Sequence, residues 1–188
     1  MTTVDSLWYL ADEADQCAAQ AYHRVSEAHS GTPIEKTYEK RVSRPRFRTL
    51  AERIRASGAP YGAHTLVYRR SGELLLVRHE GVDLWVLPGG GVDESESFHE
   101  AAARELDEEA GVAAEYQGLA MLNRIDIRCD SYRTWGVLPV FCARAETIET
   151  TISDPDGEIS AARWFRPESL PDDTRDREDV LAAVRAVL

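Results

Sequence analysis

The stretch Gly90–Val112, with the sequence GGVDESESFHEAAARELDEEAGV, decides the fold of this chain. Ser97 and Glu100 form the capping-box pattern that begins a helix, and Gly111 stands where such a helix ends. Apolar side chains that can anchor the helix on a sheet recur at every fourth position, at Phe98, Ala102 and Leu106. The stretch therefore predicts a glycine-rich loop followed by an amphipathic helix over residues 97–110.

Three carboxylates share one face of this expected helix. Glu105, Glu108 and Glu109 are spaced i, i+3, i+4, so their directions fall within about 60° of one another. Like charges so placed repel, and a hard divalent cation such as Mg²⁺ or Mn²⁺ reverses that cost because it prefers oxygen ligands. The glycines before the helix let backbone atoms approach a metal or phosphate closely, and the helix N-terminus favours anions. The pattern predicts a site that binds a divalent metal ion next to a phosphate group.

The register of the stretch is more specific than its acidity. It reads Gly90, five residues, Glu96, seven residues, Arg104-Glu105-Leu106, one residue, Glu108-Glu109, one residue, Gly111-Val112. This resembles the Nudix box at every defined position. A solvated acidic helix would explain the acids but not the two glycines, the arginine and their spacing. The flanking segments 85–90 and 158–171 also resemble those of the family, so the resemblance covers about residues 60–170.

The resemblance implies a role for each matching position. The expected metal ligands are Glu105, Glu108, Glu109 and the backbone carbonyl of Gly89. Arg104, counted with the three glutamates as catalytic, is expected to pair with Glu96, and this pair would orient the ligating carboxylates. Either Glu105 or an acid of the loop 146–158 is expected to help deprotonate the attacking water.

The same resemblance implies an α+β fold, an α/β/α sandwich around a mixed sheet. It also implies Mg²⁺-dependent hydrolysis, with Mn²⁺ as an alternative metal, of the pyrophosphate bond in a nucleoside diphosphate linked to another moiety. Nucleotide sugars, ADP-ribose-like compounds and modified nucleoside triphosphates are the expected small-molecule substrates. The alternative is a nucleotide-sensing regulatory protein of the same fold. Loss of a box carboxylate would favour that alternative, and none is lost.

The remaining sequence predicts a helical N-terminal extension, 1–58, followed by the Nudix domain, 59–188. Small and apolar residues at spacings of three and four predict a helix from Asp5 to about His29, and a shorter helix is expected over 47–56. Gly58 and Pro60 mark the boundary. The expected strands are 65–68, 73–78, 84–87, 119–128, 132–143 and 161–166, before a last helix over 176–188.

The extension contains a basic segment in an otherwise acidic chain. Residues 36–55 hold eight cations and two acids, whereas the whole chain carries a net charge of −11. One interpretation is a solvated helix face that neutralises nearby acids. The other is a docking surface for an anionic partner, or a contact between two copies in a homodimer.

Substrate contacts outside the box are weakly indicated. Cations and aromatic residues on the expected strands could hold phosphates or stack on a base, and a loop acid could assist catalysis; the candidates are Arg128, Arg133, Tyr132 and Glu158. The proline typical of relatives that split ADP-ribose is absent from residues 112–138, and Tyr132 lies further from the box than the tyrosine of diadenosine-polyphosphate relatives.

Composition limits the other classes of function. A chain of 188 residues with 43% apolar residues suggests one domain with a small appendage, and its net charge of −11 should repel nucleic acid and anionic membranes. No apolar run approaches the length of a membrane span, and no secretory signal is evident at Met1. The three cysteines show no metal-binding or disulfide spacing, so we expect a reducing cytoplasm.

The charge balance makes a testable prediction about salt. Only Lys36 and Lys40 are lysines among 22 cations, against 33 acids, a composition that resembles proteins of salt-loving microbes. Because salt screens self-repulsion, the thermal unfolding midpoint should rise between low and molar KCl. A midpoint that does not change with KCl would contradict this interpretation.

Overall fold

The computed structural model describes residues 6–188. Its helices are α1 (Ser6–Ala28), α2 (Arg44–Ser57), α3 (Phe98–Ala110) and α4 (Arg177–Val187), with a 3-10 turn, η1, at Pro167–Ser169. Its strands are β1 (Thr37–Arg41), β2 (Ala63–Tyr68), β3 (Leu74–His79), β4 (Leu84–Val86), β5 (Gly89–Gly90), β6 (Ala114–Cys129), β7 (Tyr132–Ala145) and β8 (Ile159–Phe165). The first helix thus matches the predicted one, although its expected start, Asp5, lies outside the described residues.

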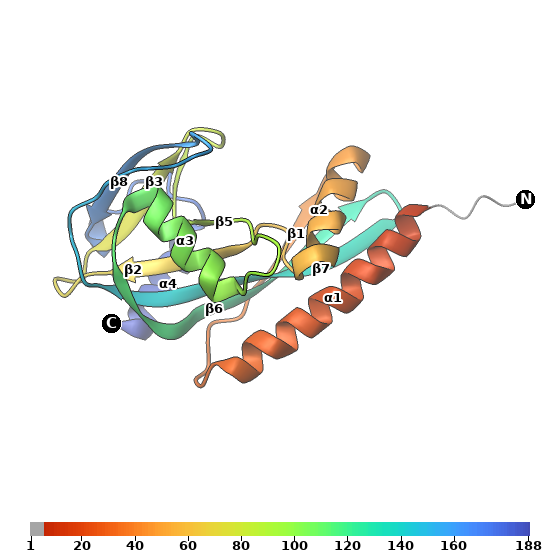
Figure 1. Cartoon of the computed structure of the whole chain (residues 1–188), viewed down its shortest axis with the longest axis horizontal. Helices are drawn as coiled ribbons and strands as arrows, with labels where there is room; N and C mark the ends of the chain where they lie inside the picture. The colour runs from red at the N-terminus through yellow and green to blue at the C-terminus, as the bar shows by residue number, and fades with distance from the viewer. Residues whose placement is uncertain (1–5) are drawn as a thin grey trace, which may run out of the picture.

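The strands form one mixed sheet in the order β1-β6-β7-β2-β3-β4, with β5 paired to β2 and β8 paired to β3. The long strands β6 and β7 form an antiparallel hairpin, whereas β2 runs parallel to β7 and β1 runs parallel to β6. Figure 1 shows α3 in front of the sheet and α4 behind it. This arrangement confirms the predicted α+β sandwich around a mixed sheet.

The apolar run of β3 explains why helices cover both faces. Leu74 and Leu76 pack in the cluster that contains Val180 and Val184 of α4. Leu75 and Val77 alternate with them and pack in the cluster around Leu106 of α3. A strand buried on both faces reads as a continuous apolar run rather than as an alternating pattern. β3 is therefore the centre of the sandwich that carries α3.

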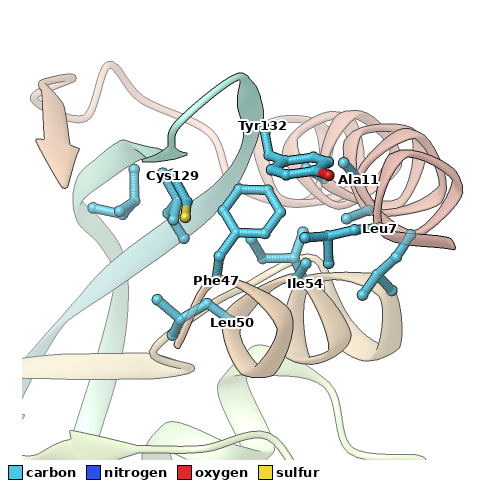
Figure 2. Close-up of a cluster of buried hydrophobic side chains, with 13 residues drawn as sticks. Leu7, Ala11, Phe47, Leu50, Ile54, Cys129 and Tyr132 are labelled. Carbon is cyan, nitrogen blue, oxygen red and sulfur yellow. The ribbon is translucent and has the colours of Figure 1, made fainter. Parts of the chain in front are cut away.

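The N-terminal helices pack beside the far end of the β6–β7 hairpin (Figure 1). Figure 2 shows side chains of α1, α2 and the hairpin meeting in one buried cluster, which includes Leu7, Phe47 and Ile54. Gly58 ends α2 with φ 89°, and a Cβ placed there would lie 2.2 Å from the Cβ of Ala21. A glycine at this cap therefore allows the close approach of α1 and α2.

The extension is not wholly helical, which corrects the sequence prediction. Residues 37–41 form β1, which hydrogen-bonds along β6 at the edge of the sheet. Four of its five side chains are exposed, and hydrogen bonds of the main chain hold the strand in place. Its sequence, TYEKR, therefore needs no alternation of apolar residues and shows none. The two-residue strand β5 and the first five residues of β6 were also not predicted.

No helix within residues 6–188 combines the length and the apolar character that spanning a membrane requires.

Asp179 of α4 connects the C-terminal helix to the extension. Its carboxylate accepts hydrogen bonds from Lys36 Nζ and from the hydroxyl of Tyr38 on β1. Burial by itself raises the pKa of Asp179, but the two hydrogen bonds outweigh burial and hold that pKa below its ordinary value. The contact therefore stabilises the folded state only while the carboxylate is ionised.

Replacing Asp179 with asparagine should lower the free energy of unfolding at pH 7 by about 2 kcal/mol, the usual size for a hydrogen-bonded charge. Because the folded-state pKa is lowered, the stabilisation is complete above the unfolded-state pKa of about 3.9 and is lost as pH falls through the folded value. Urea denaturation of both proteins at pH 7 and below pH 3 measures this. Glu178→Gln, on an exposed side chain of the same helix, is the control. An equal difference at both pH values would contradict the prediction.

Candidate active site

The residues at the two ends of α3 fix the helix where the sequence predicted it. The Ser97 hydroxyl accepts a hydrogen bond from the Glu100 backbone N–H at 3.2 Å, and the Glu100 carboxylate accepts one from the Ser97 N–H at 2.8 Å. At the other end Gly111 adopts a left-handed conformation with φ 63° and donates its N–H to the carbonyl of Asp107. With Leu106 buried against the sheet, the helix has both a fixed length and a fixed rotation.

Arg104 ties the glycine-rich loop to this helix. Its Nε and Nη2 donate to the two carboxylate oxygens of Glu96 at 2.8 and 3.0 Å, a bidentate pair, and Nη2 also donates to the carbonyl of Gly91 at 2.9 Å. Its Nη1 donates to Glu105 at 2.9 Å. Arg104 chiefly, against the effect of burial, holds the pKa of Glu96 below its ordinary value. The structure thus brings Glu96 and Arg104 together and places a cation beside the box carboxylates.

The two glycines of β5 lie directly against the carboxylates. Gly89 donates its N–H to Glu109 at 2.9 Å, and the Glu109 side chain is buried, at 7% exposure. Gly89 has φ 149°, and a Cβ there would lie 2.3 Å from the carbonyl oxygen of Ala63. A Cβ on Gly90 would lie 2.6 Å from the carboxyl carbon of Glu105. Side chains are therefore excluded here by the packing of β5 against β2 and α3.

Burial governs the protonation of these acids. The pKa of Glu109 is raised to about 8, chiefly by burial; the Gly89 N–H opposes this shift, and the charges of Glu105, Asp154 and Glu108 add to it. Burial also raises the pKa of Glu105, against the opposing effect of Arg104. Removing several carboxylates from water at one place costs free energy that Arg104 alone only partly offsets.

A divalent cation fits this donor set by its chemistry. Carboxylate oxygens and a backbone carbonyl are the ligands that Mg²⁺ and Mn²⁺ prefer, and the surplus of negative charge is what such an ion neutralises. Within residues 6–188 no group of three or more aspartate, glutamate, histidine or cysteine side chains is already arranged to hold a metal ion. The Arg104 guanidinium contacts Glu108 at 3.4 Å as well as Glu105.

The box lies at one end of an open cleft with a volume of about 1050 Å³. The cleft runs from α3 and the loop 154–158, across β6 and β7, to α2 and β1. The predicted loop acid Glu158 lines it, with its carboxylate 3.3 Å from Nε2 of His79. Box residues on its wall are Gly89, Gly90, Arg104, Glu105, Glu108 and Glu109.

The other three predicted substrate residues do not line this cleft. Tyr132 is 7% exposed and packs with Phe47 in the cluster between the hairpin and the extension helices (Figure 2). Arg128 forms an ion pair with Glu39 at 3.1 Å, and Arg133 lies opposite Arg128 across the hairpin. All three stand near the tip of the β6–β7 hairpin, away from α3. The two strands of this hairpin were predicted, but no local pattern indicates that its tip lies away from the box helix.

Two polar side chains of the cleft were not predicted. Asn123 of β6 is 3% exposed, and His64 of β2 lies beside Gly89. Within the described part of the chain, Asn123 Oδ1 and His64 Nδ1 are buried and have no hydrogen-bond partner. Burial chiefly, with Arg175 and His79, lowers the pKa of His64 to about 4, so the ring is neutral at pH 7. No local motif marks either residue, because each reaches the cleft only through strand pairing.

Comparison with known proteins agrees with this geometry. The sequence profile of the NUDIX domain matches residues 59–184. The chain belongs to the Nudix hydrolase family, whose members use divalent metals, and it is an enzyme of the pyrophosphate-cleaving class.

Individual relatives differ in the substrates that their names give. A Bacillus subtilis (strain 168) protein named for 8-oxo-dGTP diphosphatase activity is 33% identical over 111 residues, covering 58% of this chain and 68% of the relative. An RNA pyrophosphohydrolase of Novosphingobium aromaticivorans is 36% identical, over 47% of this chain and 63% of its own. The crystal structure of a MutT NUDIX hydrolase from Burkholderia pseudomallei, 30% identical, aligns with a TM-score of 0.54 over 65% of this chain and 95% of that one.

The glycines of the loop provide a matched pair of substitutions. Gly90→Ala should displace the Glu105 carboxylate and lower kcat about 100-fold, the scale expected for a misplacement near 1 Å. Gly91→Ala, next to it, has no heavy atom within 4 Å of the new Cβ and should retain activity. Steady-state kinetics and thermal midpoints of both variants test this. Equal losses of kcat in the two variants would contradict it.

Proposed function

We propose that this enzyme hydrolyses, with Mg²⁺ or alternatively Mn²⁺, the pyrophosphate bond of a nucleoside diphosphate linked to another moiety. The observation that carries the proposal is the packing of Glu105 and Glu109 of α3 against the glycine strand β5, with Glu108 beside Arg104 on the wall of the same open cleft. An acidic site can hold an anionic substrate only through cations, and the carboxylates supply the ligands for them.

Each side chain then has a separate task. Glu105, Glu108, Glu109 and the Gly89 carbonyl would hold the metal, which supplies neutralisation of phosphate oxygens and a lower pKa for attacking water. Arg104 is held by Glu96 and acts as a positioning residue, because it fixes the glycine-rich loop relative to the carboxylates of α3. The proton of the attacking water goes to Glu105 or to a loop acid on the cleft, Asp156 or Glu158.

Asp154 is the loop acid that is least suited to accept this proton. Its carboxylate accepts the backbone N–H groups of Glu158 and Ile159 at 2.6 and 2.8 Å, so it is occupied in shaping the loop. Asp156 and Glu158 remain accessible on exposed side chains beside the box. The loop 154–158 therefore presents two candidate bases from a turn that Asp154 holds.

Two relatives guide the choice of substrates to test. One is named for 8-oxo-dGTP and another for RNA, and both names describe nucleotides with a pyrophosphate bond to cleave. A panel of nucleoside triphosphates, oxidised nucleotides, nucleotide sugars, ADP-ribose and dinucleotides, with Mg²⁺ or Mn²⁺, covers the proposed class. Binding without turnover of any panel member would instead favour a nucleotide sensor.

Glu108→Gln and Glu109→Gln should each lower kcat by about 10²–10⁴-fold, because each removes a charged oxygen ligand and leaves the helix intact. Asp107→Asn is the matched control, since this carboxylate is exposed on the same helix and does not line the cleft. Product release on the best panel substrate, with far-UV circular dichroism to verify folding, gives the readout. Near-normal turnover with Mg²⁺ in both glutamine variants would refute the metal-site assignment.

A further inference from the structure

One polar residue interrupts an apolar surface in the middle of the cleft. Residues two apart on β6 face the same side of the sheet, and Asn123 stands there between Met121 and Ile125. On β7 the residues opposite Met121 and Asn123 are Val140 and Leu138. All five line the cleft, and four of them are apolar. These five side chains, the cleft floor, therefore offer a ligand an apolar surface that carries one amide group.

The side-chain carbonyl of Asn123 lacks a hydrogen-bond donor. The residue is 3% exposed, and no donor within residues 6–188 reaches its Oδ1. A buried acceptor in this state lowers the stability of the fold, so such groups are nearly always satisfied by the protein or by a bound molecule. Because the last torsion of an asparagine side chain is soft, rotation of the amide turns Oδ1 toward the cleft that the residue lines. Asn123 thus indicates a ligand that supplies a donor.

Two donors of the neighbouring edge segment are directed elsewhere. The backbone carbonyl of Lys36 accepts the N–H of Arg124, so Lys36 stands beside Asn123 at the edge of the sheet. Its Nζ nevertheless donates to Asp179 of α4, and the hydroxyl of Tyr38 donates to the other oxygen of the same carboxylate. The fold therefore commits both donors to α4 and leaves the Asn123 carbonyl for a donor from a bound molecule.

The acids on the adjacent wall favour an uncharged group at this position. Asp176 and Asp179 of α4 line the cleft together with Asn123. Their carboxylates repel phosphate groups, whereas metal ions held by the glutamates of α3 attract them. A nucleotide that enters the cleft is therefore oriented with its phosphates at the box and its uncharged part at Asn123.

Strand register sets the distance between Asn123 and the box. From Gly89 on β5 to Met121 on β6 there are three strand spacings, because β2 and β7 lie between them. Asn123 lies two residues further along β6. At ~4.8 Å per strand and ~3.3 Å per residue, Gly89 and Asn123 lie on the order of 16 Å apart. One nucleotide, joined to the carboxylates through a metal ion, spans such an interval.

A nucleobase suits the cleft floor better than a sugar does. The face of a base is apolar and aromatic, so it packs well against aliphatic side chains and the sulfur of Met121, while its edge carries N–H donors. A sugar would instead bury several hydroxyls against Ile125, Leu138 and Val140, whose side chains form no hydrogen bonds.

We propose that Asn123 determines the base specificity of this enzyme, by accepting a hydrogen bond from an exocyclic amino group of the substrate's nucleobase. Such a group projects beyond the ring, so it reaches the amide while the ring lies on the cleft floor. Adenine, guanine and cytosine carry an exocyclic amino group, whereas uracil, thymine and hypoxanthine do not. The assignment rests on the proposed function for the position of the phosphates, and Asn123 takes no part in bond cleavage.

Binding of nucleotides that resist hydrolysis tests this proposal. The ligands are α,β-methylene diphosphates in three pairs: guanosine and inosine, adenosine and purine riboside, cytidine and 2-pyrimidinone riboside. The members of each pair differ by one amino group. Full-length wild-type protein and the Asn123→Leu variant are titrated with each ligand by calorimetry in Mg²⁺. The matched control is Thr134→Val, which alters a buried polar residue of β7 whose hydroxyl donates to Asp15 at 2.8 Å and which does not line the cleft.

At least one amino-bearing ligand should bind the wild-type protein about 10-fold or more tightly than its partner, and Asn123→Leu should reduce that ratio below about 2-fold. Thr134→Val should leave the ratio unchanged. A ratio that persists in Asn123→Leu, or equal binding within all three pairs, would overturn the proposal and leave the proposed function standing. If none of the six ligands binds, the proposal fails, and turnover of the nucleotide panel by the wild-type enzyme then decides whether the proposed function fails with it.

Thermal unfolding without any ligand gives an independent readout. Asn123→Leu keeps the branched shape of the side chain and removes an unsatisfied acceptor, so it should raise the unfolding midpoint of the free protein. Thr134→Val removes a hydrogen bond that is formed and should lower the midpoint. A lower midpoint for Asn123→Leu would mean that the carbonyl has a structural partner, and would contradict the proposal. If the leucine variant does not fold, Asn123→Ala repeats the titrations.

Discussion

The close packing of two carboxylates against a glycine strand is the constraint on which the rest of this structure depends. Glu109 is buried against the Gly89 N–H, and Glu105 occupies the space that a side chain on Gly90 would need. Gly62 on β2 is subject to the same crowding, because a Cβ there would lie 1.7 Å from the carbonyl oxygen of Gly90. Carboxylates can be held this close only by strong local partners, which explains why Arg104 binds the loop and the helix simultaneously.

The sheet supplies the rigidity that this crowding requires. β3 is buried on both faces, so α3 and α4 are fixed to a common platform. The β6–β7 hairpin extends well beyond that platform, and its far end would expose Ile125 and Ile127 without a cover. α1 and α2 provide that cover through Phe47, Leu50 and Ile54, while β1 protects the outer edge of β6. The extension is thus part of the same folded body as the catalytic core.

Features that depend on interactions between residues close together in the sequence could be predicted, and features that depend on distant residues could not. The helix of the box, its caps and the Glu96–Arg104 pair depend on residues less than fifteen positions apart, so spacing alone indicates them. β1 could not be found this way, because an exposed edge strand depends on hydrogen bonds to β6 and carries no apolar pattern. The same limit applies to Asn123, and to Tyr132, an aromatic strand residue that packs in a core cluster rather than along the cleft.

Charged side chains are distributed unevenly along the cleft. Glutamates and loop acids gather at the box, whereas Lys40, Arg46 and Arg53 of the extension line the same cleft together with Asp176 and Asp179, in a chain whose net charge is −11. Charges of both signs along one cleft favour one orientation of a charged ligand over the other. With α2 held against β6 by Phe47 and Leu50, the cations of the basic segment stand at a fixed distance from the glutamates of α3.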